Sequence, residues 1–192
     1  KFNIPITPFD RLIQAFEQDQ VVTSYRDWDG VFGYCVNSAN PVGHLILYLC
    51  GYRDEERQKL SDATCTALQL ANFWQDVTVD LQKDRIYLPL FLFEKYGYAE
   101  ADLFAHRFDN RFERVMHDAV DVAQELFERG LPLIKTVDRR LALDLELFSR
   151  GGMRVLDKIR AQGYDVLRQR PAISKFERIG LLLRCLPRLV VR

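Results

Sequence analysis

The chain has 192 residues, 48% of them hydrophobic and 28% charged, which is the size and balance of one globular domain that packs a core without a disulfide or metal support. Basic and acidic residues balance at 27 each, so the chain lacks the overall basic excess that is typical of many nucleic-acid-binding proteins. Ten glycines and seven prolines are few for a turn-rich β protein.

Targeting and redox signals are weak. The longest strongly apolar run, residues 45–50, is far shorter than the ~20 residues of a membrane span. The first ten residues lack a secretory signal, and the chain starts with Lys, so its native start could be missing. Each cysteine lies in an apolar stretch at no metal-ligand spacing, which predicts buried reduced thiols in a cytoplasmic protein (Cys35, Cys50, Cys65 and Cys185).

The first half of the chain reads as helices. Thr7 and Pro8 resemble an N-cap and a first helical position, and apolar residues follow at helical spacing (Leu12, Ile13 and Phe16). A short helix is expected near 27–37. Asn40 and Pro41 open another that stops at Gly51, with a buried side predicted to carry Val42, Leu45, Ile46 and Leu49. Residues 54–79 contain neither Gly nor Pro, which predicts one long helix.

The second half continues in the same way. A polar break at 82–85 precedes a short helix that ends near Gly97, and further helices are expected near 110–129 and 136–162. In the last of these, Gly151 and Gly152 indicate either a close helix crossing or an opening in a cavity wall. A capping box at 174–177 predicts a final helix that stops before Pro187. Without alternating strand patterns, the sequence predicts an all-α bundle of packed helices.

Oxygen-bearing side chains gather near the end of the long predicted helix. At ~100° per residue they share an arc of about 80° and rise ~12 Å from Asn72 to Asp80. The members of this stripe are Gln69, Asn72, Asp76 and Asp80. Carboxylate and amide oxygens suit Mg²⁺ that also contacts substrate phosphates, which Lys83 and Arg85 could hold just beyond.

The alternative for this stripe is an ordinary solvated helix face. Two observations favour the metal. Cys65, Leu68 and Val79 share the face, and a carboxylate among apolar neighbours is unfavourable without a compensating cation. In addition, no Lys or Arg stands four residues along to pair with Asp76.

Two segments resemble the signatures of the squalene/phytoene synthase family. Residues 72–80, followed by residues 85–89, resemble its second aspartate-rich motif. Residues 34–43 resemble its other signature, Tyr-Cys followed by a small-residue turn and Val-Gly. Ser-Ala-Asn-Pro-Val-Gly together with Asn-Phe-Trp-Gln-Asp is most similar to the hydroxysqualene synthase branch of bacterial hopanoid biosynthesis. The resemblance runs from about Ile4 to the C-terminus.

This resemblance implies an isoprenoid synthase fold and a role for each matching residue. It makes Asn72, Asp76 and Asp80 Mg²⁺ ligands, and it places Tyr34 over the reacting carbons, where its ring can stabilise a carbocation. Positions implied to lie near the diphosphate-bearing substrate are Gln69, Gln75, Arg85 and Tyr87. Gln75 stands where many members have Arg, and a substrate-contacting tyrosine of relatives is absent around residues 151–152.

One family feature has no match. The first aspartate-rich motif lies well upstream of the Tyr-Cys signature in the family, whereas Tyr34 is close to the start of this chain, and neither Asp10 nor Asp27 has an Asp-x-x-x-Asp partner. We therefore expect residues 1–192 to form a single, partial isoprenoid synthase domain that lacks its first helices. Such a chain could be inactive alone.

The function that the resemblance implies is Mg²⁺-dependent conversion of presqualene diphosphate to hydroxysqualene with release of diphosphate. Alternatives are a head-to-head prenyl transferase that makes presqualene diphosphate, squalene or phytoene, and a non-catalytic helical module that binds a membrane or a partner. Residues 150–192 carry a net charge of +8, which indicates either an ordinary amphipathic helix or peripheral contact with anionic lipid at the inner membrane surface. No catalytic role is expected for His44, His106 or His117, and Trp28 and Trp74 are predicted to line the core or a cavity.

Overall fold

The computed structural model describes residues 2–177 and 180, and helices dominate this part of the chain. Its β structure is a single isolated parallel bridge between Ser24 and Ile86 within these residues. The predicted all-α class is confirmed. The helices are α1 (Thr7–Gln18), α2 (Trp28–Ser38), α3 (Asn40–Leu49), α4 (Glu55–Gln75), α5 (Val77–Leu81), α6 (Leu90–Tyr96), α7 (Glu100–Phe104), α8 (Asn110–Gly130), the 3₁₀ helix η1 (Leu131–Lys135) and α9 (Arg139–Ala161).

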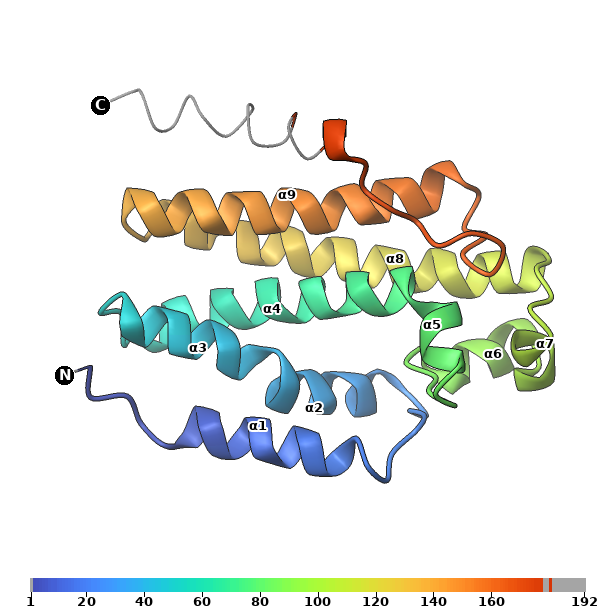
Figure 1. Cartoon of the computed structure of the whole chain (residues 1–192), viewed down its shortest axis with the longest axis horizontal. Coiled ribbons are helices and arrows are strands. Elements are labelled where there is room, and N and C mark those ends of the chain that lie inside the picture. Colours follow the sequence, from blue (N-terminus) through green and yellow to red (C-terminus); the bar gives the residue numbers. More distant parts are fainter. Residues whose placement is uncertain (1, 178–179, 181–192) are drawn as a thin grey trace.

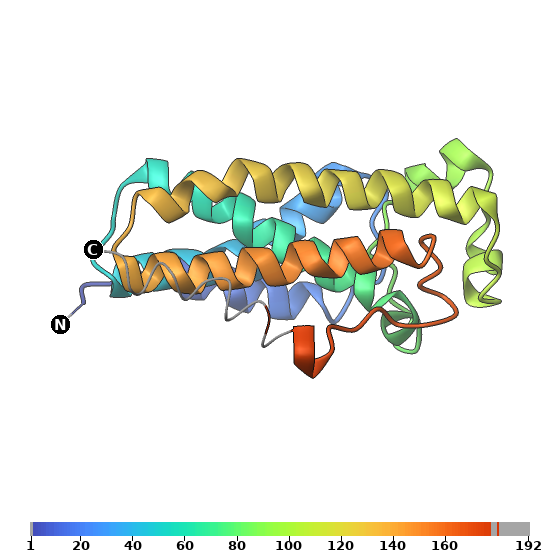
Figure 2. The same ribbon diagram turned by 90° about the horizontal axis from the view of Figure 1, so that it is seen from above.

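The long helix α4 is the centre of the bundle. It packs against α8 and α9 on one side and against α2 and α3 on the other, while α1 lies outermost beyond α2 (Figure 1). Seen from above, α8 and α9 run alongside one another for most of their length (Figure 2). The short helices α5, α6 and α7 gather at one end of the bundle (Figure 1). No helix among the described residues is long and apolar enough to cross a membrane.

The core lies along α4 and α8. Trp74 is fully buried, and its indole Nε1 donates a hydrogen bond of 2.9 Å to the carbonyl of Ala119 on α8, so this ring is core as predicted. Small residues allow the helices to approach closely. A Cβ on Gly43 of α3 would lie 2.3 Å from Ser61 Oγ on α4, a distance that only glycine avoids.

Two predictions about the first half are wrong. On α3, Val42, Ile46 and Leu49 are 40–51% exposed. The buried side of that helix carries Pro41, Gly43 and Leu47 instead. α3 is apolar nearly all round, so periodicity did not identify its packed face. Cys50 is exposed rather than buried because it is the C-cap of α3. Cys35 is buried and Cys65 partly buried, and Cys185 lies outside the described residues.

The predicted continuous helix over 54–79 is also wrong, because the chain breaks at Asp76. There the backbone has φ −105° and ψ 16°, and α5 starts in a new direction (Figure 1). The β-branched residues Val77, Thr78 and Val79 follow the break and lie within α5, where such side chains lose rotamer freedom. The one-turn spacing between Asn72, Asp76 and Asp80 is nevertheless kept across the break. Asp76 N donates to the carbonyl of Asn72, and Asp80 N donates to that of Asp76, both at 2.9 Å.

The end of the described chain returns to α9. The predicted capping box is confirmed, since Glu177 N donates to Ser174 Oγ at 3.3 Å and Ser174 N donates to Glu177 Oε2 at 2.8 Å. The Glu177 carboxylate also forms ion pairs with Arg154 and Lys158 of α9, at 2.7 and 3.0 Å. These bonds hold residues 174–177 against the bundle. The predicted helix end before Pro187 lies outside the described residues.

Candidate active site

The junction of α4 and α5 brings two predicted metal ligands together. Asp76 and Asp80 are one helical turn apart through the bond across the break, and each is partly buried. Burial, followed by the neighbouring charge of Asp76, raises the pKa of the Asp80 carboxyl to about 6. Lys83 and Arg85 act in the opposite direction on this pKa. Burial and the neighbouring negative charge thus disfavour ionisation of both carboxylates at once, and a close carboxylate pair is suited to a divalent cation.

Arg170 completes this site, and the sequence analysis missed it. It lies in the segment after α9, and its Nε donates to Asp76 Oδ1 in a short ion pair. The adjacent carbonyl of Pro171 accepts a hydrogen bond from Gln75, so this segment is attached at two neighbouring positions. The only signal in the sequence was the basic excess after residue 150, because 94 residues separate Arg170 from its partner.

A wall of aromatic rings stands beside the acidic pair. Tyr34 is buried, and its ring centroid lies 6.1 Å from that of Phe73 and 5.7 Å from that of Tyr87. Phe73 and Tyr87 are stacked at 3.7 Å, and Tyr25 lies 5.6 Å from Tyr34. Burial, then the neighbouring Tyr87, raises the pKa of Tyr34, which therefore stays a neutral phenol. Electron-rich rings in an apolar setting are suited to stabilise a cation.

Two loops position this wall. Arg85 Nη2 donates to the carbonyl of Asp19 at 2.9 Å, and Ile86 N donates to that of Thr23 at 2.7 Å. Two more backbone bonds, from Leu90 to Tyr25 and from Phe91 to Arg26, continue the connection. The loop after α1 and the loop after α5 are therefore held together, and Arg85 and Tyr87 are brought to Tyr34.

An apolar cleft of about 220 Å³ opens farther along α4. Cys65 and Leu68, which precede Asn72 on the same face of the helix, form part of its floor. Val42 and Ile46, exposed against expectation, belong to its wall, so the apolar face of α3 looks onto a cavity. The lining comprises Val42, Gly43, Ile46, Leu47, Ser61, Thr64, Cys65, Leu68, Leu133, Leu141, Leu145 and Phe148.

The structure thus gathers five predicted residues, Asp76, Asp80, Arg85, Tyr87 and Tyr34. The structure ties the other predicted site residues less closely to this group. Asn72 is exposed one turn before Asp76, Lys83 is exposed but close enough to act on Asp80, and Gln69 is partly buried on α4. Among the described residues, no three His, Cys, Asp or Glu side chains form a group that could hold a metal ion. The proposed ligand set has only two carboxylates, with an amide oxygen as its third member.

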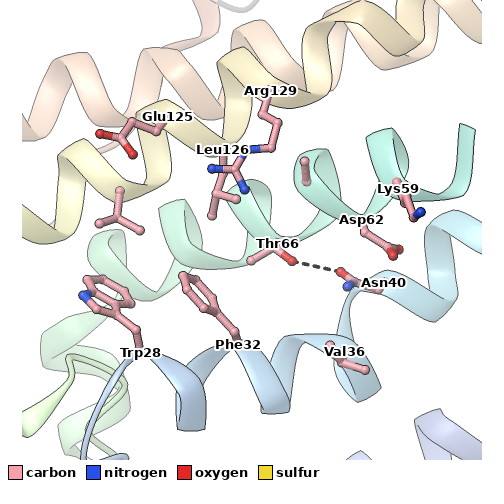
Figure 3. A pocket seen from close by; sticks show the side chains of 12 residues that line it. Trp28, Phe32, Val36, Asn40, Lys59, Asp62, Thr66, Glu125, Leu126 and Arg129 are labelled. Atoms are coloured by element: carbon pink, nitrogen blue, oxygen red, sulfur yellow. Dashed lines mark hydrogen bonds between the residues drawn. The ribbon is translucent and has the colours of Figure 1, made fainter. Parts of the chain in front are cut away.

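A separate groove of about 590 Å³ lies between α2, α4 and α8. Trp28 and Phe32, stacked at 5.5 Å, form one wall, and Asn40 accepts a hydrogen bond of 3.0 Å from Thr66 (Figure 3). Trp28 therefore lines a cavity, as predicted. None of the predicted site residues lines this groove. The active-site prediction concerns the other side of α4.

Comparison with known proteins shows the family of this chain. Residues 1–177 match the family described as squalene/phytoene synthase. The chain belongs to this family. Hydroxysqualene synthase of Zymomonas mobilis is 29% identical over 174 residues, which are 88% of this chain and 57% of that protein. Phytoene synthase of Thermus thermophilus is 30% identical over 183 residues, 95% of this chain and 62% of the relative.

Solved structures of squalene/phytoene synthase relatives share the fold. Squalene synthase HpnC from Alicyclobacillus acidocaldarius superposes with a TM-score of 0.83 at 45% identity, over 85% of this chain and 62% of that one. A dehydrosqualene synthase superposes with a TM-score of 0.87 at 20% identity, over 97% of this chain and 66% of that one. The predicted isoprenoid synthase type of helical fold is confirmed. This chain spans about three-fifths of the length of these two curated relatives.

Proposed function

We propose that this chain is part of a Mg²⁺-dependent enzyme that converts presqualene diphosphate to hydroxysqualene. The proposal rests on one observation: along one face of α4, an acidic end is followed by turns that border an apolar cleft. Its C-terminal end, with α5, carries Asp76 and Asp80, and the preceding turns border the apolar cleft. A substrate with a charged head and a long hydrocarbon tail matches such a face, because each part meets its own chemistry.

Asn72, Asp76 and Asp80 would hold Mg²⁺. When bound, this ion neutralises the diphosphate charge that develops as the leaving group departs. Arg170, Lys83 and Arg85 would bind the diphosphate oxygens, since guanidinium and ammonium groups are strong donors to phosphates. Arg170 pairs with Asp76 in this structure, so substrate and cation would replace that contact.

Tyr34 would act at the other end of the breaking bond. Its ring, supported by Phe73 and Tyr87, offers a π face to the carbocation that remains once diphosphate leaves. The apolar cleft would hold the hydrocarbon chains and exclude bulk water from them. Rearrangement of the cyclopropyl skeleton and capture by one water would then give the alcohol.

Relatives support the hopanoid branch without excluding the wider family chemistry. Hydroxysqualene synthase and squalene synthase HpnC are among them, but so is phytoene synthase. A head-to-head prenyl transferase therefore stays the alternative. Product analysis by mass spectrometry separates the two, with presqualene diphosphate and Mg²⁺ as one reaction and two farnesyl diphosphates as the other.

We expect hydroxysqualene from presqualene diphosphate, in equal yield with and without a nicotinamide cofactor. Squalene formed only with the reduced cofactor would favour squalene synthesis, because that reaction consumes a reductant. Accumulation of presqualene diphosphate from farnesyl diphosphate alone would favour the transferase. Failure to release diphosphate from either substrate would contradict an enzymatic role and favour a helical binding module.

A further inference from the structure

Arg170 is the cation that directly contacts the acidic pair of the candidate site. Its Nε donates to Asp76 Oδ1. Within the described part of the chain, Asp76 has no other ion pair and Asp80 has none. The nearby guanidinium of Arg85 is directed elsewhere, since its Nη2 donates to the carbonyl of Asp19 at 2.9 Å. Arg170 therefore occupies, with its own charge, the carboxylate to which the proposed function assigns Mg²⁺.

The segment that carries Arg170 is attached at two places, while the Arg170 side chain has room to turn. Gln75 donates to the carbonyl of Pro171, and Glu177 binds the end of the segment to α9 through ion pairs of 2.7 and 3.0 Å. The Arg170 side chain is 47% exposed and borders a cavity of about 280 Å³ between α9 and this segment. Its guanidinium can therefore leave Asp76 without displacement of the backbone.

We propose that Arg170 couples the binding of Mg²⁺ to the binding of diphosphate: it holds Asp76 in the empty site and transfers to the diphosphate when Mg²⁺ takes that carboxylate. This inference rests on the proposed function. Mg²⁺ alone has to displace a favourable ion pair and leave a guanidinium beside the ion, and like charges repel. A diphosphate removes this penalty, because its oxygens are strong acceptors for the released guanidinium. Each ligand therefore raises the affinity for the other, by the same factor.

The competition between Arg170 and Mg²⁺ is tested by isothermal titration of Mg²⁺ without diphosphate. Wild type, Arg170→Gln and Arg168→Gln are compared. Arg168 is the matched control because it is an exposed arginine two positions away, and its side chain forms no ion pair with any described residue. Without the internal competitor, Arg170→Gln should bind Mg²⁺ at least about fivefold tighter than wild type. Arg168→Gln should match wild type.

The transfer of Arg170 to diphosphate is tested by titration of inorganic diphosphate, with and without saturating Mg²⁺. A blank titration of diphosphate into Mg²⁺ removes the heat of their own association. The factor by which Mg²⁺ raises the diphosphate affinity should fall at least about fivefold from wild type to Arg170→Gln. Arg170→Lys keeps a cation without the planar fork of donors, so it should retain part of that factor.

A purely structural contact between Arg170 and Asp76 gives a different result. Arg170→Gln would then unfold at a lower temperature with an unchanged affinity for Mg²⁺, which would overturn the proposal. An equal gain in Arg168→Gln would also contradict it, because the effect would come from general charge. Arg170→Met replaces Arg170→Gln if the latter loses its helical circular dichroism. Absence of Mg²⁺ binding to wild type in the presence of diphosphate would instead overturn the proposed metal site, and this inference with it.

Discussion

Tyr34 has a predicted role in the reaction that two substitutions can test. It is buried among Tyr25, Phe73 and Tyr87, so both a core role and a role in catalysis use its ring. Tyr34→Phe retains the ring and should lose only about 0.5–1.5 kcal/mol of stability. Tyr34→Leu removes the π face and should slow turnover by far more than Tyr34→Phe.

Turnover and thermal unfolding measured on both variants separate the roles. If Tyr34→Leu folds and turns over at the wild-type rate, Tyr34 does not face the reacting carbons. If Tyr34→Phe is already slow while its unfolding temperature is unchanged, the hydroxyl and not the ring makes the essential contact.

Asp80 predicts a dependence of stability on pH. Its pKa of about 6 lies above its ordinary value of 3.8, so the carboxylate is less favourable in the folded than in the unfolded chain. The favourable contribution of its neutral form is present below pH 3.8 and is lost as pH rises through about 6. Asp80→Asn should therefore raise stability in metal-free buffer at pH 7.5, by about 1 kcal/mol once water screening is considered.

Denaturant unfolding at several pH values checks this expectation. The gain should disappear near pH 4, where wild-type Asp80 is itself largely protonated. Asp84→Asn is the matched control, since it removes an exposed acid from the same loop region. Equal gains in both variants would mean that general charge, and not the Asp76–Asp80 pair, limits stability.

At the residue level, the predicted site residues that the structure brings together are mostly close in the chain. Asp76, Asp80, Arg85 and Tyr87 lie within twelve positions, so helical spacing and the motif could bring them together. Arg170 could not be found in this way. It reaches Asp76 from a segment 94 residues away, and a single basic residue in a loop gives no spacing signal.

At the scale of the elements, α9 contains a matched pair of glycines. A Cβ on Gly152 would lie 2.3 Å from Phe127 Cζ on α8 and 3.0 Å from Leu68 on α4, whereas a Cβ on Gly151 would meet nothing within 4 Å. Of the two interpretations left open for this pair, Gly152 supports the close helix crossing. Gly152→Ala should destabilise the fold by about 1–3 kcal/mol through overpacking.

Gly151→Ala should instead stabilise α9 by up to about 1 kcal/mol, because alanine is the better helix former. Urea unfolding of both variants measures the difference. Similar effects of the two substitutions would contradict the close packing of α9 against Phe127.

The presence of helices was predictable for most of the chain, but the helix breaks and the buried side of each helix were less predictable. Gly and Pro punctuation located α3 and α6, whereas a stretch without Gly or Pro gave no sign of the break at Asp76. The short helices α7 and η1 carried too little periodicity to be expected. Burial on α3 failed because a helix that is apolar all round does not indicate which side meets a partner.

For the whole molecule, part of the net positive charge of residues 150–192 is neutralised by ion pairs with acidic residues. Arg150 pairs with Glu146, Arg154 and Lys158 with Glu177, and Arg170 with Asp76. Less of the basic excess is therefore free for anionic lipid than a count of charges implies. Contact with a membrane surface stays a prediction for the remaining basic residues.

The central claim is that the acidic pair at the α4–α5 junction binds diphosphate through Mg²⁺. Isothermal titration of inorganic diphosphate, with and without Mg²⁺, tests it on wild type, Asp76→Asn and the control Asp84→Asn. We predict binding at least about tenfold tighter with Mg²⁺ in wild type and Asp84→Asn, a difference of about 1.4 kcal/mol, and loss of that dependence in Asp76→Asn. Equal affinity with and without Mg²⁺ in wild type, or a dependence unchanged in folded Asp76→Asn, would contradict the claim.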